Sequence, residues 1–284
     1  MKKLKVLDLF SGIGGLSLGL ERAGMETVAF CESDKHCQKV LKKHWPKIPI
    51  HDDICFLETI YDRNKYDDSY VLDSKVDIIC GGFPCQNISV GGKQDGISGD
   101  RSSLWKEYWR LINEIKPKYA IIENVERLRK NGLGVVLNDL SKIGYDAEWH
   151  CITARDVGLP HQRDRLFIIA NNSSKRQDEC SGKKRQIQVN EKWESEKIHT
   201  KREGCEFEPG KVRTILSRGD IESIRDAYSS DFSVVSKLRR VTNGVPEKLD
   251  ESRRKQRIKQ LGNSVVPQIA ELIGKAILEY EKSI

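Results

Sequence analysis

The sequence lacks any long apolar stretch and most of the short motifs that mark metal and dinucleotide sites. None of its apolar runs approaches the roughly 20 residues that a membrane-spanning helix needs, so we expect no membrane partner. It has no CxxC pair and no HExxH, and a metal site is therefore not expected. No segment repeats another, which argues against a repeat architecture.

The N-terminus also lacks the pattern of a secretion signal. Its basic start, MKKLK, is followed at once by an aspartate and a glycine-rich turn, which predicts a strand. Several of the eight cysteines lie inside apolar runs. We therefore expect reduced thiols and a cytoplasmic location rather than a disulfide framework.

Positive charge is concentrated in one segment. The chain has 49 Lys and Arg against 42 Asp and Glu, a net charge of +7. Residues 171–260 hold 22 of the basic and 15 of the acidic side chains, which accounts for the whole excess. Such a segment is typical of nucleic-acid binding, although a solvated linker would have the same composition.

Residues 1–170 alternate short apolar runs with helical patterns. We expect strands over 6–10, 26–32, 76–80, 118–124, 147–153 and 164–170, and helices over 15–24, 34–44, 103–115 and 134–144. This order predicts an α/β fold with a Rossmann-like, mostly parallel sheet and helices on both faces. Ligands should then gather at the carboxyl ends of the strands.

The composition changes at Asn171, after which polar residues dominate and clear periodicity is lost until about residue 212. Order returns over 261–282, which predicts a final amphipathic helix after a GNS turn. We therefore divide the chain into a large domain, residues 1–170 and 258–284, and a small irregular domain, residues 171–257.

A glycine-rich loop, DLFSGIGG, separates the first expected strand from the first helix. Gly12, Gly14 and Gly15 permit a tight turn and a close approach of a ligand to the backbone. A GxGxxG fingerprint fails because Ser17 stands at the last position. The loop therefore has no need to hold a pyrophosphate, and an NAD-dependent dehydrogenase is disfavoured.

Two acidic residues strengthen the interpretation of this loop. Glu32 ends the second strand, where a carboxylate can accept hydrogen bonds from both hydroxyls of a ribose. Asp53 could hold an adenine amino group, although alone it is more simply a loop carboxylate. A glycine loop and an acid without the pyrophosphate fingerprint fit S-adenosylmethionine better than NAD.

A cysteine follows the third expected strand in the stretch GGFPCQNIS. Cys85 comes directly after Pro84, whose fixed φ restricts the orientation of the cysteine. The following residues, 86–103, are rich in glycine and serine, as in loops that close over a substrate. A lone cysteine near a strand end is more often a small buried residue.

Three further residues fall at strand ends of the same expected sheet. Glu123 ends the fourth strand, where partial burial would raise its pKa and suit it to act as an acid. Arg163 and Arg165 enter the last strand on one face and could bind a carbonyl oxygen. Taken singly, Glu123 could be a helix cap and the two arginines could form surface ion pairs. Their expected position at the same edge of the sheet as Cys85 favours a catalytic site.

In their order along the chain, these motifs resemble those of the cytosine-C5 DNA methyltransferases, in a compact bacterial or phage form. The matching motifs are DLFSGIGG, CESD, DDI, GGFPCQNIS, ENV, QRDRLF and LGNSVVP, with a weaker match at RRVTNGVPEKLD. The resemblance covers residues 1–170 and 258–284, and the FPCQ and ENV motifs are the most specific.

The resemblance implies a role for each matching residue. The Cys85 thiolate adds to C6 of a flipped cytosine, Glu123 acts at N3 and Arg165 binds O2. The residues implied in cofactor binding are Phe10, Gly12, Gly14, Gly15, Glu32, Asp53, Ile54 and Asn263. Those implied in substrate binding are Gln86, Ser89, Arg101, Asn124 and Arg163.

The resemblance also implies S-adenosyl-L-methionine as cofactor, double-stranded DNA as partner and a monomeric enzyme. Residues 171–257 would form the target-recognition domain, and the enzyme would belong to, or protect against, restriction-modification. It would act in a bacterial cytoplasm or nucleoid, or in an infected host cell. The recognition sequence is not predicted.

Other functions fit the sequence less well. A tRNA cytosine methyltransferase shares this chemistry, but the PPC and CFT motifs of that relative are absent. A zinc deaminase needs H-x-E and P-C-x-x-C, and neither occurs. A non-catalytic binding module would be expected to lose Cys85, Glu123 or Arg165, and all three are present.

Overall fold

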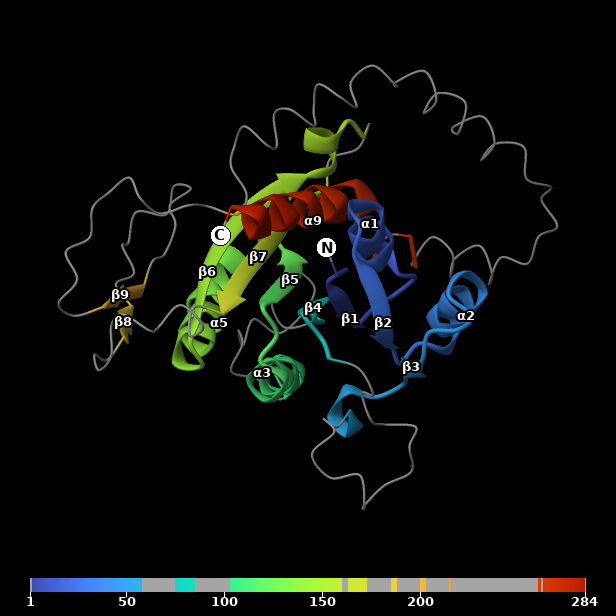
Figure 1. Ribbon diagram of the computed structural model, residues 1–284, viewed down its shortest axis with the longest axis horizontal. Coiled ribbons are helices and arrows are strands. Elements are labelled where there is room, and N and C mark those ends of the chain that lie inside the picture. Colours follow the sequence, from blue (N-terminus) through green and yellow to red (C-terminus); the bar gives the residue numbers. More distant parts are fainter. Residues whose placement is uncertain are drawn as a thin grey trace.

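A seven-stranded sheet is the centre of the molecule in the computed structural model (Figure 1). The structure describes residues 2–57, 75–84, 103–159, 163–172, 185–187, 200–202, 215, 260–261 and 263–283. The strands are β1 (Lys5–Leu9), β2 (Glu26–Cys31), β3 (Ile50–His51), β4 (Ile78–Gly82), β5 (Tyr119–Val125), β6 (Tyr145–Thr153) and β7 (Asp164–Asn172). Their order across the sheet is β3-β2-β1-β4-β5-β7-β6.

The sheet is parallel except at one strand. Strands β3, β2, β1, β4 and β5 pair in parallel, whereas β7 is antiparallel to both β5 and β6. The connection from β6 to β7 is too short to contain a crossover helix, and a direct return of the chain requires antiparallel pairing. The expected Rossmann-like, mostly parallel fold is confirmed, with β7 inserted between β5 and β6.

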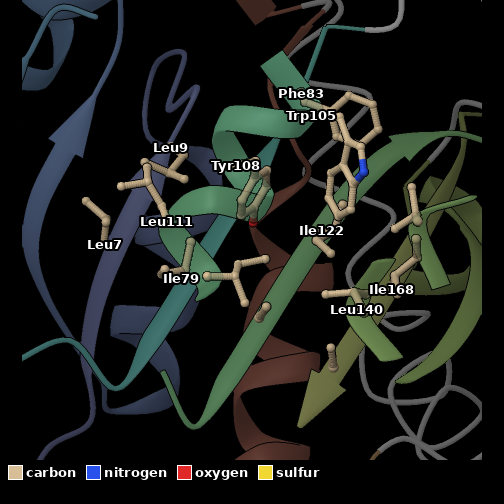
Figure 2. Close-up of a cluster of buried hydrophobic side chains, with 14 of the residues drawn as sticks. Leu7, Leu9, Ile79, Phe83, Trp105, Tyr108, Leu111, Ile122, Leu140 and Ile168 are labelled. Carbon is tan, nitrogen blue, oxygen red and sulfur yellow. The ribbon is translucent and has the colours of Figure 1, made fainter. Parts of the chain in front are cut away.

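Helices cover both faces of the sheet. The helices are α1 (Gly15–Ala23), α2 (Lys35–His44), α3 (Ser103–Ile115), α4 (Leu128–Asn131), α5 (Leu133–Lys142) and α9 (Pro267–Lys282). Side chains of α3 and α5 pack into one apolar cluster and those of α1 and α9 into another. Figure 2 shows the first cluster, in which Trp105 and Tyr108 of α3 lie over Ile79 and Ile122 of the sheet.

The alternation of side chains along the strands explains this division. In β1, Val6 faces the cluster of α1 and α9, and Leu7 and Leu9 face the cluster of α3 and α5. Asp8 shares the face of Val6 and therefore points towards α1, where it accepts a hydrogen bond from Ser17. Because both faces are apolar, the strands are almost continuously hydrophobic, as in buried parallel sheets.

The predicted helices agree closely with the observed ones. Helix α3 has the expected bounds, and Asp34 caps α2 by accepting hydrogen bonds from the backbone N–H groups of His36 and Cys37. Gly24 ends α1 in the left-handed conformation, with φ 110°. The sequence did not predict the short elements β3, α4, η1 (Ile54–Phe56) and η6 (Ala154–Val157).

The predicted second domain, residues 171–257, is described only in small part. Its described residues include the end of β7, the hairpin of β8 (Arg185–Ile187) and β9 (Thr200–Arg202), and Ile215. Ile215 is buried in the cluster of α1 and α9, and its N–H donates to Glu148 Oε2 over 3.1 Å. One point of this segment therefore packs against the sheet, and the proposed division into domains stays a prediction.

Two further expectations concern thiols and membranes. Among the described residues, Cys31, Cys37, Cys55, Cys80 and Cys151 form no disulfide, and the other three cysteines lie outside the described residues. Within the described part of the chain, no helix is both long and apolar enough to cross a membrane.

Glycines allow α9 to lie directly against α1 (Figure 1). A Cβ added to Gly19 of α1 would meet the carbonyl oxygen of Pro267 and would lie 2.5 Å from Cβ of Ala270. On α9, a Cβ on Gly274 would lie 2.7 Å from Cβ of Ala23. Because these obstacles are backbone atoms or short side chains, a larger residue would push the helices apart.

We expect Gly19→Ala to lower the free energy of unfolding by about 1–3 kcal/mol, the usual cost of overpacking a core. Gly134→Ala in α5 is the matched control, since nothing lies within 4 Å of its added Cβ. The control should be neutral or stabilising by about 0.4–1 kcal/mol. Urea unfolding of both variants measures the difference, and equal stabilities would contradict this account of the crossing.

Candidate active site

A buried ion pair lies at the carboxyl end of β5. Nε of Arg165 is 2.9 Å from Oε1 of Glu123, and the two side chains are only 23% and 11% exposed. In the ladder Glu123 pairs with Phe167 and Val125 pairs with Arg165, so the two charged residues are diagonal neighbours on one face. The antiparallel insertion of β7 thus brings Arg165 to the carboxylate.

The surroundings of Glu123 favour its protonated form. Burial raises the pKa of the Glu123 carboxyl, against the opposing effects of Arg165 and Arg163, so the net shift is upward. Arg165 also donates from Nη1 to the carbonyl oxygen of Asp164 over 2.9 Å, which fixes the guanidinium. The site therefore holds a carboxyl group that keeps its proton to a higher pH than an exposed glutamate does, beside a fixed cation.

Arg163 lies just before β7, in agreement with the strand expected from residue 164. Its Nη1 donates to the carbonyl oxygen of Leu261 over 3.2 Å. Its Nε and Nη2 are buried and find no hydrogen-bond acceptor among the described residues. Burial, with a smaller contribution from Arg165, lowers the pKa of Arg163. These nitrogens are donors available to an oxygen of a ligand.

The segment that leaves β4 is tied to β5 next to this pair. Nδ2 of Asn124 donates to the carbonyl oxygen of Phe83 over 3.2 Å, and Phe83 is buried against Trp105. Pro84 follows at the surface and is the last described residue of this stretch. Cys85 comes next in the sequence, and with Gln86, Ser89 and Arg101 it lies outside the described residues.

The glycine loop turns sharply after β1. Phe10, Gly12 and Gly14 have φ values of 52°, 56° and 84°, in the left-handed region. Nothing lies within 4 Å of the position of a Cβ on Gly12, so space is open above this residue. At Gly14 the same position lies 2.7 Å from the ring of Trp45, so only glycine fits there.

Glu32 joins this loop to the end of β2. Its Oε2 accepts from the N–H of Gly12 over 2.6 Å, and its Oε1 accepts from the N–H of Asp34 over 2.7 Å. A carboxylate has about four acceptor positions, so further donors can bind the same oxygens. Glu32 is thus held beside the open space at Gly12.

The other expected cofactor residues lie at two places. Asp53 caps η1, where its Oδ1 accepts from the N–H of Cys55 over 2.9 Å, and Ile54 is buried. Asn263 is helical, as are residues 260 and 261, and lies shortly before α9. Next to it, Ser264 and Val265 lie so close to Gly15 that an added Cβ would be 2.6 Å from Oγ of Ser264. The turn before α9 therefore packs against the glycine loop.

Asp8 is a feature of the site that we did not predict. It is fully buried directly behind the glycine loop, and Ser17 donates to its Oδ2 from Oγ over 2.7 Å and from N over 3.3 Å. Burial outweighs these hydrogen bonds and raises the pKa of Asp8 to about 7. Its place in the apolar run VLDLF was the available signal, because a charged residue there must find a partner.

Metal ligation has no candidate in the described ranges, where no group of three or more His, Cys, Asp or Glu side chains could hold an ion.

Comparison with known sequences decides the family. The pattern of the C-5 cytosine-specific DNA methylase family matches residues 4–252. The chain belongs to this family.

Two curated members of the C-5 cytosine-specific DNA methylase family illustrate the similarity. Type II methyltransferase M2.BsuMI of Bacillus subtilis is 35% identical over 176 residues, which are 59% of this chain and 42% of the relative. Type II methyltransferase M.HhaI of Haemophilus parahaemolyticus is 34% identical over 170 residues, 58% of this chain and 48% of the relative.

The chain thus spans less than half the length of these two methylases. Among solved structures, a protein described as a prophage-encoded DNA modification methyltransferase of E. coli superimposes with a TM-score of 0.50 and 30% identity. That match covers 61% of this chain and 48% of the other chain. The fold and the family are therefore those that the motifs indicated.

Gly82 gives the Glu123 carboxyl its space, because an added Cβ would collide with Oε2 of that side chain. We expect Gly82→Ala to displace the carboxylate from Arg165 and to lower the free energy of unfolding by about 1–3 kcal/mol. In a Glu123→Ala background the methyl group has room, so the same substitution should cost less than half as much. A double-mutant cycle by urea unfolding measures this coupling. Equal costs in both backgrounds would show that the carboxyl does not occupy this position.

Proposed function

We propose that the chain is a DNA (cytosine-5-)-methyltransferase that methylates C5 of a flipped cytosine in a specific duplex sequence through a covalent adduct with Cys85. The observation that carries this proposal is the buried pair of Glu123 and Arg165, tied through Asn124 to the segment that leads into Cys85. The membership of the family supplies the reaction class, and this pair supplies the groups that the reaction needs.

In the proposed reaction the Cys85 thiolate adds to C6 of cytosine, which raises electron density at C5. Glu123 donates a proton or a hydrogen bond to N3, so that the negative charge is spread over the ring. The upward direction of its pKa shift suits this role, because a raised pKa keeps the proton on the carboxyl to a higher pH. Loss of the proton from C5 after methylation then breaks the bond between C6 and sulfur and releases Cys85.

Two arginines would hold the base. Arg165 would bind the carbonyl oxygen O2 while its Nε keeps the contact with Glu123. Arg163 has two buried nitrogens with no acceptor in the described part of the protein, and these could bind O2 or a neighbouring phosphate. Asn124, by holding Phe83, would position the approach of Cys85 to the base.

The residues around the glycine loop fit S-adenosyl-L-methionine. When bound, this cofactor supplies the methyl group that C5 takes. Glu32 has unused acceptor positions for the ribose hydroxyls beside the open space at Gly12. Asp53 and Ile54 would form the adenine end, and Phe10, Gly14 and Asn263 the rest of the pocket. The absence of a pyrophosphate fingerprint at Ser17 agrees with a nucleoside that carries no phosphate.

Residues 171–257 would read the DNA sequence, with phosphate contacts from their many basic side chains and base contacts that set specificity. The curated relatives are named as type II methyltransferases, so we propose a role in restriction-modification. Double-stranded DNA would be the partner of a monomeric enzyme that acts where the DNA lies, in a bacterial cytoplasm or an infected host cell.

The test is transfer of tritiated methyl groups from S-adenosylmethionine to unmethylated duplex DNA, with tRNA assayed beside it. We expect DNA alone to be labelled, Cys85→Ser to abolish labelling, and Glu123→Gln to reduce kcat by about 10²–10⁴-fold, as for the loss of a general acid. Binding of S-adenosylhomocysteine should change little in the Cys85→Ser variant. Labelling of tRNA alone, or turnover by Cys85→Ser, would refute the proposal.

A further inference from the structure

Arg110 on α3 forms hydrogen bonds with a turn that lies 53 to 56 residues earlier in the sequence. Its Nη2 donates to the carbonyl oxygens of Ile54 and Leu57, each over 3.2 Å. The two oxygens belong to the first residue of η1 and to the residue that follows it, and the Ile54 carbonyl also accepts the N–H of Leu57 over 3.3 Å.

Two glutamates of α3 hold the guanidinium in the orientation in which it contacts the turn. Nε of Arg110 is 2.7 Å from Oε2 of Glu107, and Nη1 is 2.9 Å from Oε2 of Glu114. Burial of Arg110 opposes its charge, yet the two carboxylates outweigh this effect and raise its pKa. The three side chains are about one third exposed, so the pairs add little to stability and act mainly to orient the fork.

The turn is consequently held at both ends. Asp53 caps its start by accepting from the N–H of Cys55, and Arg110 binds the carbonyl oxygen of Ile54 at the start and that of Leu57 after the end. Between them, Ile54 and Leu57 are buried in the cluster of α3 and α5. A turn fixed by hydrogen bonds at both ends and by apolar packing in the middle presents the Asp53 side chain in one position.

We propose that Arg110 is a positioning residue for the adenine end of the cofactor, acting through the turn that carries Asp53 and Ile54. This inference rests on the proposed function, which assigns those two residues to the cofactor pocket. Lysine cannot replace arginine here, because one ammonium group cannot reach two carbonyl oxygens and two carboxylates in the same geometry. Arg110 itself touches neither the cofactor nor the reacting atoms in this account.

Affinity for the cofactor product and base discrimination test the inference. We expect Arg110→Lys and Arg110→Gln to weaken S-adenosylhomocysteine binding and to raise KM for S-adenosylmethionine by about 10–100-fold, the effect of a displacement of about 1 Å. The value of kcat at saturating cofactor should stay within about threefold. Preference for S-adenosylhomocysteine over S-inosylhomocysteine should shrink as well, because Asp53 would no longer be aligned with the amino group that only adenine has. Calorimetric titration and steady-state kinetics measure these quantities.

Lys106→Gln is the matched control, since it removes a positive charge from an exposed position of the same helix and leaves both contacts of Arg110 with the turn. Its affinity and base preference should stay within about threefold of the wild type. Binding is measured at a temperature at which melting curves show that each variant is folded. If Arg110→Gln unfolds, Arg110→Lys, which retains the positive charge, serves as the test variant.

The two proposals fail in different ways. Wild-type protein that binds no S-adenosylhomocysteine would refute the proposed function. Wild-type binding, together with unchanged affinity and unchanged base preference in the folded Arg110 variants, would refute the positioning role alone. A fall in kcat with KM unchanged would also overturn it, because it would place the effect of Arg110 on the chemical step.

Discussion

The buried ion pair of Glu123 and Arg165 is the interaction on which the proposed chemistry depends. An isolated carboxylate in this place would be costly, and an isolated guanidinium equally so, but each makes the burial of the other possible. The pair exists because β7 runs antiparallel between β5 and β6 and places Arg165 diagonally across from Glu123. The carboxyl keeps a raised pKa in spite of the nearby cation, which shows that desolvation is the stronger effect.

The glycine loop and its surroundings depend on close packing around glycines. Gly14 makes room for Trp45, Gly15 receives the turn before α9, and Gly19 lets α9 lie on α1. Segments from the two ends of the chain thus pack together beside the glycine loop. Behind that loop, Asp8 binds the first turn of α1 through Ser17, so the position of the loop is linked to the packing of the helix.

The sequence was sufficient to predict most of the fold, because the relevant signals are local. Apolar runs marked the strands, Asp34 and Gly24 marked the ends of helices, and the broken GxGxxG at Ser17 separated the loop from dinucleotide sites. Glu123 and Arg165 were correctly expected at the same edge of the sheet. Their direct contact was not, because it depends on the direction of β7 and hence on the length of a connection.

Long-range hydrogen bonds were the other features that the sequence could not reveal. The contact of Arg110 with Ile54 and Leu57 has no periodic pattern, and the i+3 and i+4 spacing of Glu107 and Glu114 suggested only an ordinary helix surface. The same holds for the burial of Ile215 against the sheet. Cys85 was predicted from its motif, and its role as nucleophile stays a prediction because it lies outside the described residues.

Trapping of the covalent adduct tests the central claim most directly. Duplex DNA in which 5-fluorocytosine replaces cytosine is incubated with the protein and S-adenosylmethionine, under conditions in which ordinary DNA is methylated. Fluorine at C5 blocks the final elimination, so a band shifted in a denaturing gel should form, and peptide mapping should place the bound nucleotide on Cys85. No adduct under these conditions, or an adduct on a different residue, would contradict the account.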